Sequence, residues 1–393
     1  MLKKIFTLIF YAAIAAAYQC PDVNIQIFPK DNPWNWNITK AEVHKFSEEY
    51  INSLGPDNSL KPWFGTRLGI PYSLVAGGKD IPVEFTGRRA ETGKMTCRIP
   101  PDAPKELGSD SRVIVIDTNN HNLYELFQAE PDNYGEWSAY SGAVFNLDTN
   151  ALRKERVFSA DPAGMAIFPG LARFQDITRG EMNHAVRVVV PDIDSRYVYP
   201  ARNSPVEKSN EKPDPTKKPE VLPAMGQRFR LKNETDITKL GVQSQIIAAG
   251  LKKHGFIVAD HGFKPYCFGT MDERWDDKDL ATLAGLKMSD FEAIVEITSL
   301  NMSALDPYEK VKLTGAPFIR GKKKAGILNV PAGKITIRIM DAKKVMVKEL
   351  ENKGVIIAWD LKDASGKDVD PGDYTIVIED PKRILKELPV KVE

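Results

Sequence analysis

The stretch between Trp63 and Ala201 constrains the fold more than any other part of the sequence. Short runs of β-branched and aromatic residues alternate there with Gly, Pro, Asn and Asp, which is the pattern of strands joined by turns. The strand candidates are Arg112–Asp117, Asn122–Phe127, Glu136–Leu147, His184–Val190 and Arg196–Tyr199. Because few helical stretches interrupt them, we expect a mainly β chain with a large, sandwich or barrel-like body.

A few helices are expected to pack against this body. Thr39 and Glu42 form a capping box, in which the two side chains accept free N–H groups at a helix start, and apolar residues follow at helical spacing. The pattern predicts helices over 40–54 and 242–254, and a short third helix that ends near Leu286.

A second, self-contained β pattern follows the body. Residues 300–324 form a basic, irregular connection, and 325–393 again alternate apolar runs with turns. Within the body, 203–222 contains four prolines, four lysines and three glutamates with almost no apolar side chains. Such a segment cannot offset its ordering entropy, so we interpret it as a surface insertion. The expected organisation is a body over 18–299, the connection, and a small β module.

The first residues resemble a secretory signal peptide. Two lysines precede an apolar run from Ile5 to Tyr18, and Ala15 and Ala17 supply a cleavage pattern of small residues. The run has 14 residues, whereas a membrane-spanning helix needs about 20. We therefore expect 1–17 to be removed, and the mature chain to be secreted, periplasmic or on the cell surface, without a membrane span. A short membrane anchor is the alternative.

Composition excludes some classes of partner. The 54 Lys and Arg residues against 53 Asp and Glu give a formal charge of +1, without the positive excess of a nucleic-acid-binding protein. The sequence has no P-loop, dinucleotide-binding, zinc-protease or nucleophile-elbow motif, so we expect no cofactor and no metal. Cys97 and Cys267 have no Cys or His at metal-ligand spacing; whether export pairs them in a disulfide stays open.

The C-terminal module resembles the Ig-like domain of flagellar hook-capping proteins. The similarity covers about 70 residues and is carried by strand and turn segments, namely Ile335–Met340, Trp359-Asp360, Asp363–Gly366 and Val369–Tyr374. The resemblance implies an Ig-like β-sandwich that acts as a spacer or in surface display, without catalysis.

The body resembles a group of exported bacterial proteins to which no activity is assigned. The similar segments span about 31–277 and are Asp31–Asn35, Phe64–Thr66, Gly69–Tyr72, Ile99–Pro104, Leu123–Leu126, Asn183–Ala185 and Arg274–Asp277. One position departs from the group, because His261 follows Asp260 where the group has Asn. The resemblance implies one large β-rich unit outside the cytoplasm and supplies no mechanism.

Five residues are candidates for catalysis. Asp117 and Glu125 lie on neighbouring predicted strands, and a glycosidase needs at least a pair of carboxyl groups. Asp161 and Glu181 lie in loops beside the strands, where functional residues concentrate. His184, before a predicted strand, could act as a general base or hold a sugar. Each residue also has a structural interpretation, as a turn former, a solvated charge or a buried, hydrogen-bonded histidine.

Arg274, Trp275 and Asp276 are candidates for substrate binding. A tryptophan face can stack on a sugar ring, and Arg and Asp can bind its hydroxyl groups. Alternatively, Asp276 caps the helix that follows and Trp275 belongs to the core.

The sequence favours a secreted carbohydrate-active protein whose partner is a polysaccharide or a cell-surface glycan. The first hypothesis is a polysaccharide hydrolase that uses a carboxylate pair. The alternative is a non-catalytic glycan-binding or structural cell-envelope protein. A concave site with two carboxylates would favour hydrolysis, an aromatic site without such a pair would favour binding, and no concave site would favour a structural role.

Overall fold

The structure is a computed structural model of the 393-residue chain. It describes residues 18–132, 134–206, 222–296, 312–314, 318, 325–328, 336–350, 356–380 and 383–393. The expected signal peptide, most of the expected insertion and much of the connection lie outside these residues. Two compact units are present, 1–296 and 297–393.

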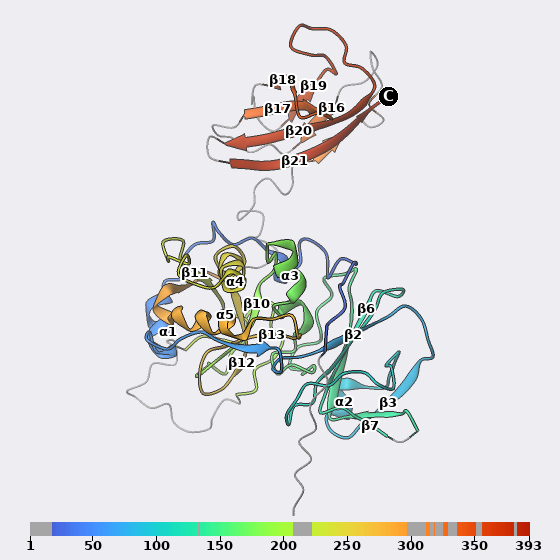
Figure 1. The fold of residues 1–393 in the computed structure, drawn as a ribbon, viewed down its shortest axis with the longest axis vertical. Coiled ribbons are helices and arrows are strands. Elements are labelled where there is room, and N and C mark those ends of the chain that lie inside the picture. The colour runs from blue at the N-terminus through green and yellow to red at the C-terminus, as the bar shows by residue number, and fades with distance from the viewer. Residues whose placement is uncertain are drawn as a thin grey trace, which may run out of the picture. The chain divides into compact units, whose positions relative to one another are not determined.

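The chain is mostly β, with 32% of residues in strands and 16% in helices. The prediction of a mainly β fold with few helices is therefore confirmed. Figure 1 shows the strands of the first unit in several separate sheets, with helices beside one of them.

The largest sheet of the first unit has six strands in the order β1-β13-β10-β12-β11-β14. Its members are β1 (Lys61–Gly65), β10 (Val186–Val190), β11 (Arg228–Leu231), β12 (Phe256–His261), β13 (Tyr266–Met271) and β14 (Phe291–Ala293). The sheet is mixed, since β10 pairs in parallel with β12 and antiparallel with β13. Strand β10 is buried along its whole length, which explains its continuous apolar run.

Helices pack on this sheet and complete its core. They are α1 (Ser47–Leu54), α3 (Phe174–Arg179), α4 (Val242–Lys253) and α5 (Asp277–Ala281). Helix α4 agrees with the prediction, and it buries Ile247 and Leu251 at helical spacing. The first helix is shorter than predicted, because the segment before it pairs with the end of β14: Val43 bridges Ile294, and Thr39 bonds Asn37 instead of capping a helix.

Two four-stranded sheets make up the rest of the first unit. One has the order β2-β5-β6-β9, with β2 (Tyr72–Val75), β5 (Val113–Asp117), β6 (Asn122–Phe127) and β9 (Ser141–Asn146). The other has the order β4-β3-β8-β7, with β3 (Ile81–Phe85), β4 (Met95–Cys97), β7 (Glu130–Pro131) and β8 (Trp137–Ala139), and the short α2 (Arg89–Thr92) follows β3.

Strand β5 separates two hydrophobic cores. Ile114 and Ile116 belong to the large core, whereas Val113 and Val115 belong to a smaller core under the second four-stranded sheet. Successive side chains of a strand point to opposite faces, so both faces of β5 are covered. Any polar side chain on β5 or β6 must therefore find a partner inside the protein.

The second unit has a four-stranded antiparallel sheet in the order β18-β17-β20-β21 and a three-stranded sheet in the order β15-β16-β19. The strands are β15 (Lys312–Thr314), β16 (Ala325–Leu328), β17 (Thr336–Asp341), β18 (Met346–Leu350), β19 (Ile356–Trp359), β20 (Gly372–Asp380) and β21 (Arg383–Val392). Its own core includes Ile337, Trp359 and Ile376, all fully buried.

Candidate functional site

The predicted hairpin of Asp117 and Glu125 forms, but its register keeps the two carboxylates apart. Strand β5 pairs antiparallel with β6, with Glu125 opposite Ile114 and Asn122 opposite Asp117. Residues directly opposite share a face, and Ile114 and Asp117 are three positions apart, so Glu125 and Asp117 point to opposite faces. They do not face one site as a pair.

Both carboxylates have partners within the fold. Asp117 is fully buried; its Oδ1 accepts the N–H groups of Asn119 and Asn120, and its Oδ2 accepts Nη1 of Arg98 at 3.0 Å. Asp117 therefore closes the hairpin turn.

Glu125 accepts the N–H groups of Ile167 and Phe168 at 2.8–2.9 Å. Burial raises the pKa of Glu125 to about 8, although these N–H groups favour the ionised form. Glu125 thus ties β6 to the loop that carries Ile167 and Phe168.

His184 and Glu181 line a hollow of about 190 Å³ beside α3. Nδ1 of His184 faces the carbonyl of Ala185 at 2.9 Å, and Nε2 faces Oδ2 of Asp176 at 3.1 Å. Burial opposes ionisation of Asp176, but the charges of Arg173 and His184 outweigh it and lower its pKa to about 2. Both ring nitrogens of His184 thus have structural partners, while Glu181 is exposed beyond the end of α3.

The three predicted substrate-binding residues hold the fold together. Arg274 donates to Asp272 and, at 2.8 Å, to the carbonyl of Cys20 in the N-terminal arm. Trp275 is only 4% exposed and packs edge-on against Phe64 and Phe174, so its faces are not open to a sugar. Asp276 caps α5 through two N–H groups.

Asp161 is the one predicted catalytic residue that lines a hollow together with a second carboxylate and aromatic side chains. The hollow has a volume of about 240 Å³, close to the lower end of small-ligand sites at ~300 Å³. We call it the Asp161 pocket. Its lining is Arg88, Asp110, Arg112, Phe127, Tyr140, Ser141, Phe158, Ser159, Ala160, Asp161, Pro162 and Asp260.

A buried arginine joins two of the three carboxylates that line this pocket, Asp161 and Asp260. Nη2 of Arg187 lies 2.7 Å from Oδ1 of Asp161 and 3.4 Å from Oδ2 of Asp260. The two carboxylate oxygens are therefore no more than about 6 Å apart. Asp260 stands beside a β-bulge, where the register between β10 and β12 shifts. Bulges redirect side chains and are frequent beside functional sites.

Asp161 and Asp260, the two carboxylates that Arg187 joins, differ in their ionisation. Burial raises the pKa of Asp161 to about 6, against the opposing charge of Arg187. Burial would also raise the pKa of Asp260, but hydrogen bonds from His261 and the charge of Arg187 outweigh burial and lower it. Asp161 is therefore the carboxyl that can exchange a proton near neutral pH.

Three polar atoms at the Asp161 pocket have no hydrogen-bond partner among the described residues. They are Oδ2 of Asp161, Nε of Arg112 and Nη1 of Arg187, all buried. An unpartnered buried polar atom costs about 1–3 kcal/mol, and in a native protein local strain, a catalytic role or a bound water or ion accounts for such an atom. Asp161 and Arg112 line the pocket, so its wall holds one free acceptor and one free donor, while Arg187 lies behind Asp161.

Aromatic side chains form part of the pocket wall. The guanidinium of Arg88 lies over the ring of Phe158, 3.4 Å from its centroid, and Phe127 meets Tyr140 edge to face at 6.2 Å. Tyr140 is 39% exposed. Its ring packs on Gly87, where a Cβ would come within 2.3 Å of it, so the ring is held in place while part of it stays open.

Sequence reasoning missed Asp260 and Arg187 as site residues. A signal existed, because Arg187 is the single charge in the apolar run Ala185–Val190, and Asp260 ends another such run. A charge inside an apolar strand is buried and must be paired. The sequence alone does not show which opposite charge pairs with such a residue.

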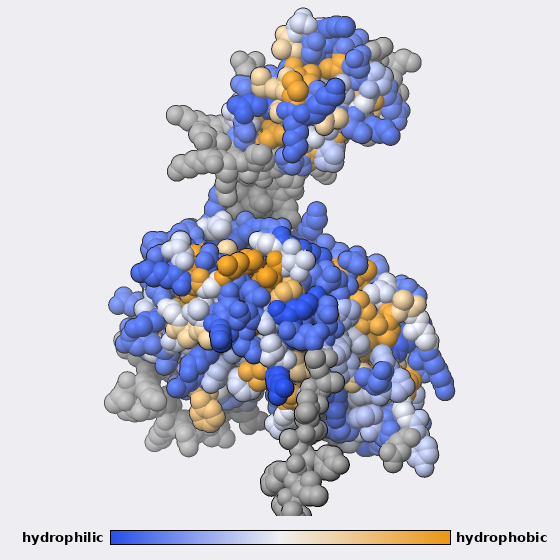
Figure 2. All heavy atoms as spheres, in the orientation of Figure 1, coloured by the Kyte–Doolittle hydropathy of each residue, from blue (hydrophilic) through white to orange (hydrophobic). Residues whose placement is uncertain are grey.

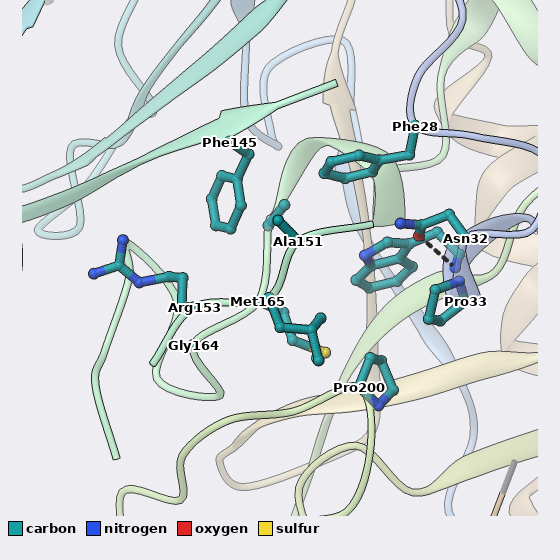
Figure 3. A pocket seen from close by; sticks show the side chains of 12 residues that line it. Phe28, Asn32, Pro33, Phe145, Ala151, Arg153, Gly164, Met165 and Pro200 are labelled. Carbon is teal, nitrogen blue, oxygen red and sulfur yellow. Dashed lines mark hydrogen bonds between the residues drawn. The ribbon is translucent and has the colours of Figure 1, made fainter. Parts of the chain in front are cut away.

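A smaller hollow in the first unit is apolar. Figure 3 shows Phe28, Phe145, Met165 and Pro200 around it, with Arg153 at one end. Its volume of about 30 Å³ has room for about two water molecules. It is too small for a sugar, so the Asp161 pocket is the better candidate.

Other kinds of site can be assessed for the described residues alone. Within them, no group of three or more His, Cys, Asp or Glu side chains is placed to hold a metal ion. The three cysteines are free, buried thiols, so Cys97 and Cys267 are not bridged. No helix in the described ranges is both long enough and apolar enough to cross a membrane.

Comparison with known proteins gives little further information. No protein-family model matches the chain, and no characterised relative does. One similar solved structure is that of PorZ, described as an essential bacterial surface component of the type-IX secretion system of Porphyromonas gingivalis. The sequence identity is 18%, the TM-score is 0.20, and the overlap covers 27% of this chain and 14% of PorZ.

Proposed function

We propose that this chain is an exported glycan-binding protein whose Asp161 pocket holds one sugar unit. The observation that carries the proposal is a buried carboxylate oxygen of Asp161 without a protein partner at the wall of a 240 Å³ hollow. The open part of the Tyr140 ring can stack on the apolar face of a sugar, and the free polar atoms can bind its hydroxyl groups. The sequence features of an exported protein support the same conclusion.

Binding of polysaccharides, measured by isothermal titration calorimetry, tests this function. Tyr140→Ala should weaken binding about tenfold, since loss of an aromatic contact costs up to about 1.5 kcal/mol. Tyr134→Ala is the matched control, because Tyr134 is 91% exposed and does not line the pocket. No binding of any glycan, or equal effects of the two substitutions, would refute the proposal.

Hydrolysis of the bound glycan is a second candidate function, favoured by the pair of Asp161 and Asp260. Their contrasting pKa shifts match an acid and an ionised partner, and their separation is compatible with a two-carboxylate hydrolase. In such a reaction, Asp161 protonates the leaving oxygen while Asp260 attacks the anomeric carbon. Water then cleaves the resulting ester, its oxygen adds to the sugar, and its proton returns to Asp161.

Release of reducing sugar from a bound glycan tests hydrolysis. Asp161→Asn and Asp260→Asn should each lower release by at least a hundredfold, the usual contribution of a positioned acid or base being about 10²–10⁴. Asp57→Asn is the control, since Asp57 is exposed and pairs with Lys287 outside the pocket. Binding without release would leave the protein a non-catalytic glycan-binding protein.

A further inference from the structure

We propose that the Asp161 pocket selects a sugar unit that carries a protonated amine, an amino sugar, over neutral and acidic sugars. This inference rests on the proposed glycan-binding function. It concerns the charge of the ligand, which the balance of ionisable groups around the pocket determines.

Carboxylates outnumber cations around the pocket. Its lining holds three carboxylates (Asp110, Asp161 and Asp260) and two guanidinium groups (Arg88 and Arg112). The groups that pair directly with these are Glu91, Glu106, Arg187 and His261. The whole cluster therefore has five carboxylates against three arginines and one histidine, so carboxylates stay in excess even when His261 is protonated, and a positive ligand would offset the excess.

The two lining arginines are already engaged by carboxylates. Nη1 of Arg88 bonds Glu91 at 2.8 Å. Nη1 and Nη2 of Arg112 bond Glu106 and Asp110, each at 2.8 Å. An acidic sugar would have to compete with these pairs, and bidentate binding to Arg112 is blocked. The arrangement therefore disfavours uronic acids.

The free acceptor of the pocket suits an ammonium group. Oδ2 of Asp161 has no partner among the described residues, and Oδ1 is held by Arg187. A charge-assisted N–H bond to a carboxylate is about twice as strong as a neutral one. The ring of Tyr140 adds an attractive surface for a cation. An amine on the sugar would use both features, whereas an acetylated amine would lose the charge.

Calorimetric titration of the full chain with short oligosaccharides tests this preference. The probes are glucosamine oligomers, N-acetylglucosamine oligomers and galacturonate oligomers of equal length. Glucosamine oligomers should bind at least tenfold more tightly than the other two, and the advantage should shrink at high salt, because screening weakens the attraction between exposed charges. A lysine oligopeptide serves as a cation without a sugar ring and should bind more weakly.

Charge-removing variants connect the preference to the pocket. Asp161→Asn and Asp110→Asn should each reduce the advantage of glucosamine at least threefold, while Asp57→Asn should keep it. Asp110 has a side-chain exposure of 44%, so its substitution leaves a folded variant if Asp161→Asn fails to fold. Equal binding of glucosamine and N-acetylglucosamine oligomers, or equal binding of the lysine peptide, would overturn the amino-sugar preference and leave glycan binding intact. No binding of any sugar would overturn both proposals.

Discussion

Glu125 shows how a single residue can resemble a catalytic acid and hold the fold together. Its side chain is fully buried, and its oxygens accept the N–H groups of Ile167 and Phe168. Burial raises its pKa to about 8. A raised pKa is frequent at active sites, yet Glu125 lines none of the three hollows described here. Its carboxyl is therefore better understood as a link between β6 and the loop after Asp161.

The pH dependence of stability follows from this pKa. The folded-state pKa of Glu125 is raised from 4.5 to about 8. The contribution of Glu125 to the free energy of unfolding is therefore fully present below pH 4.5 and is lost as the pH rises through about 8. Glu125→Gln should flatten this loss and, at acidic pH, cost about 1–3 kcal/mol through poorer pairing of the two N–H groups. Urea unfolding at a series of pH values measures both effects. Glu84→Gln, at an exposed site, should keep the original slope; an unchanged slope in Glu125→Gln would contradict the assignment.

Trp275 shows the opposite case, in which an apparent ligand contact is a core residue. The indole donates to the carbonyl of Thr270 at 2.9 Å and lies between Phe64 and Phe174. Trp275→Ala should lower the free energy of unfolding by about 3–5 kcal/mol, because it opens a cavity. Trp63→Ala should cost less, since Trp63 is 38% exposed. Unchanged stability together with lost glycan binding would restore Trp275 as a ligand contact.

At the scale of elements, the loop 159–164 positions Asp161. The hydroxyl oxygen of Ser159 accepts a hydrogen bond from the N–H of Asp161 at 2.9 Å, and the hydroxyl of Ser141 in β9 donates to the carbonyl of Ser159 at 3.1 Å. Gly164 closes the loop with a φ of +71°, which other residues rarely adopt, and a Cβ there would lie 2.6 Å from the carbonyl of Val157. The loop geometry therefore depends on this glycine.

Gly164→Ala should destabilise the protein by about 1–3 kcal/mol and weaken glycan binding, because the strain displaces Asp161. Gly180→Ala is a matched control: its φ is +73°, but no atom lies within 4 Å of the added Cβ. Thermal unfolding and calorimetric binding measure the two effects. If Gly180→Ala weakened binding as much as Gly164→Ala, the loop would not be what positions Asp161.

At the scale of the whole molecule, the chain consists of two units with separate cores. Ile337 and Trp359 belong to the core of 297–393, and among the residues that the structure describes none of that unit joins the cores of 1–296. On the face shown in Figure 2, hydrophobic residues of the first unit form separate patches in a mostly hydrophilic surface. Each unit therefore buries its apolar residues by itself, as an independent domain does.

Scanning calorimetry of the full chain should show two unfolding transitions, because units with separate cores unfold separately. Deleting 297–393 should remove one transition and leave the other at the same temperature, with glycan binding retained. A single transition that shifts on deletion would show that the units stabilise each other.

The sequence was informative wherever local pattern determines structure. A run rich in aromatic and apolar residues between turn residues predicted β6 at its observed bounds, Asn122–Phe127, and helical spacing predicted α4. The prediction of a strand over Arg196–Tyr199 was wrong, because Tyr197 makes only an isolated bridge with Met225. The predicted start of the first helix was wrong, because Val43 pairs with Ile294, which is distant in the sequence. Local propensity cannot include such pairing.

What the sequence determined by itself was the mainly β class, the positions of several strands and the helix α4. Only the tertiary structure decided which acidic residues meet. Register placed Asp117 and Glu125 on opposite faces, while Arg187 brought Asp161 to Asp260, almost a hundred residues further along the chain. The physical reason is that a side chain's face and its partners depend on the pairing of strands that are distant in sequence, and that pairing is set by the packing of the whole core.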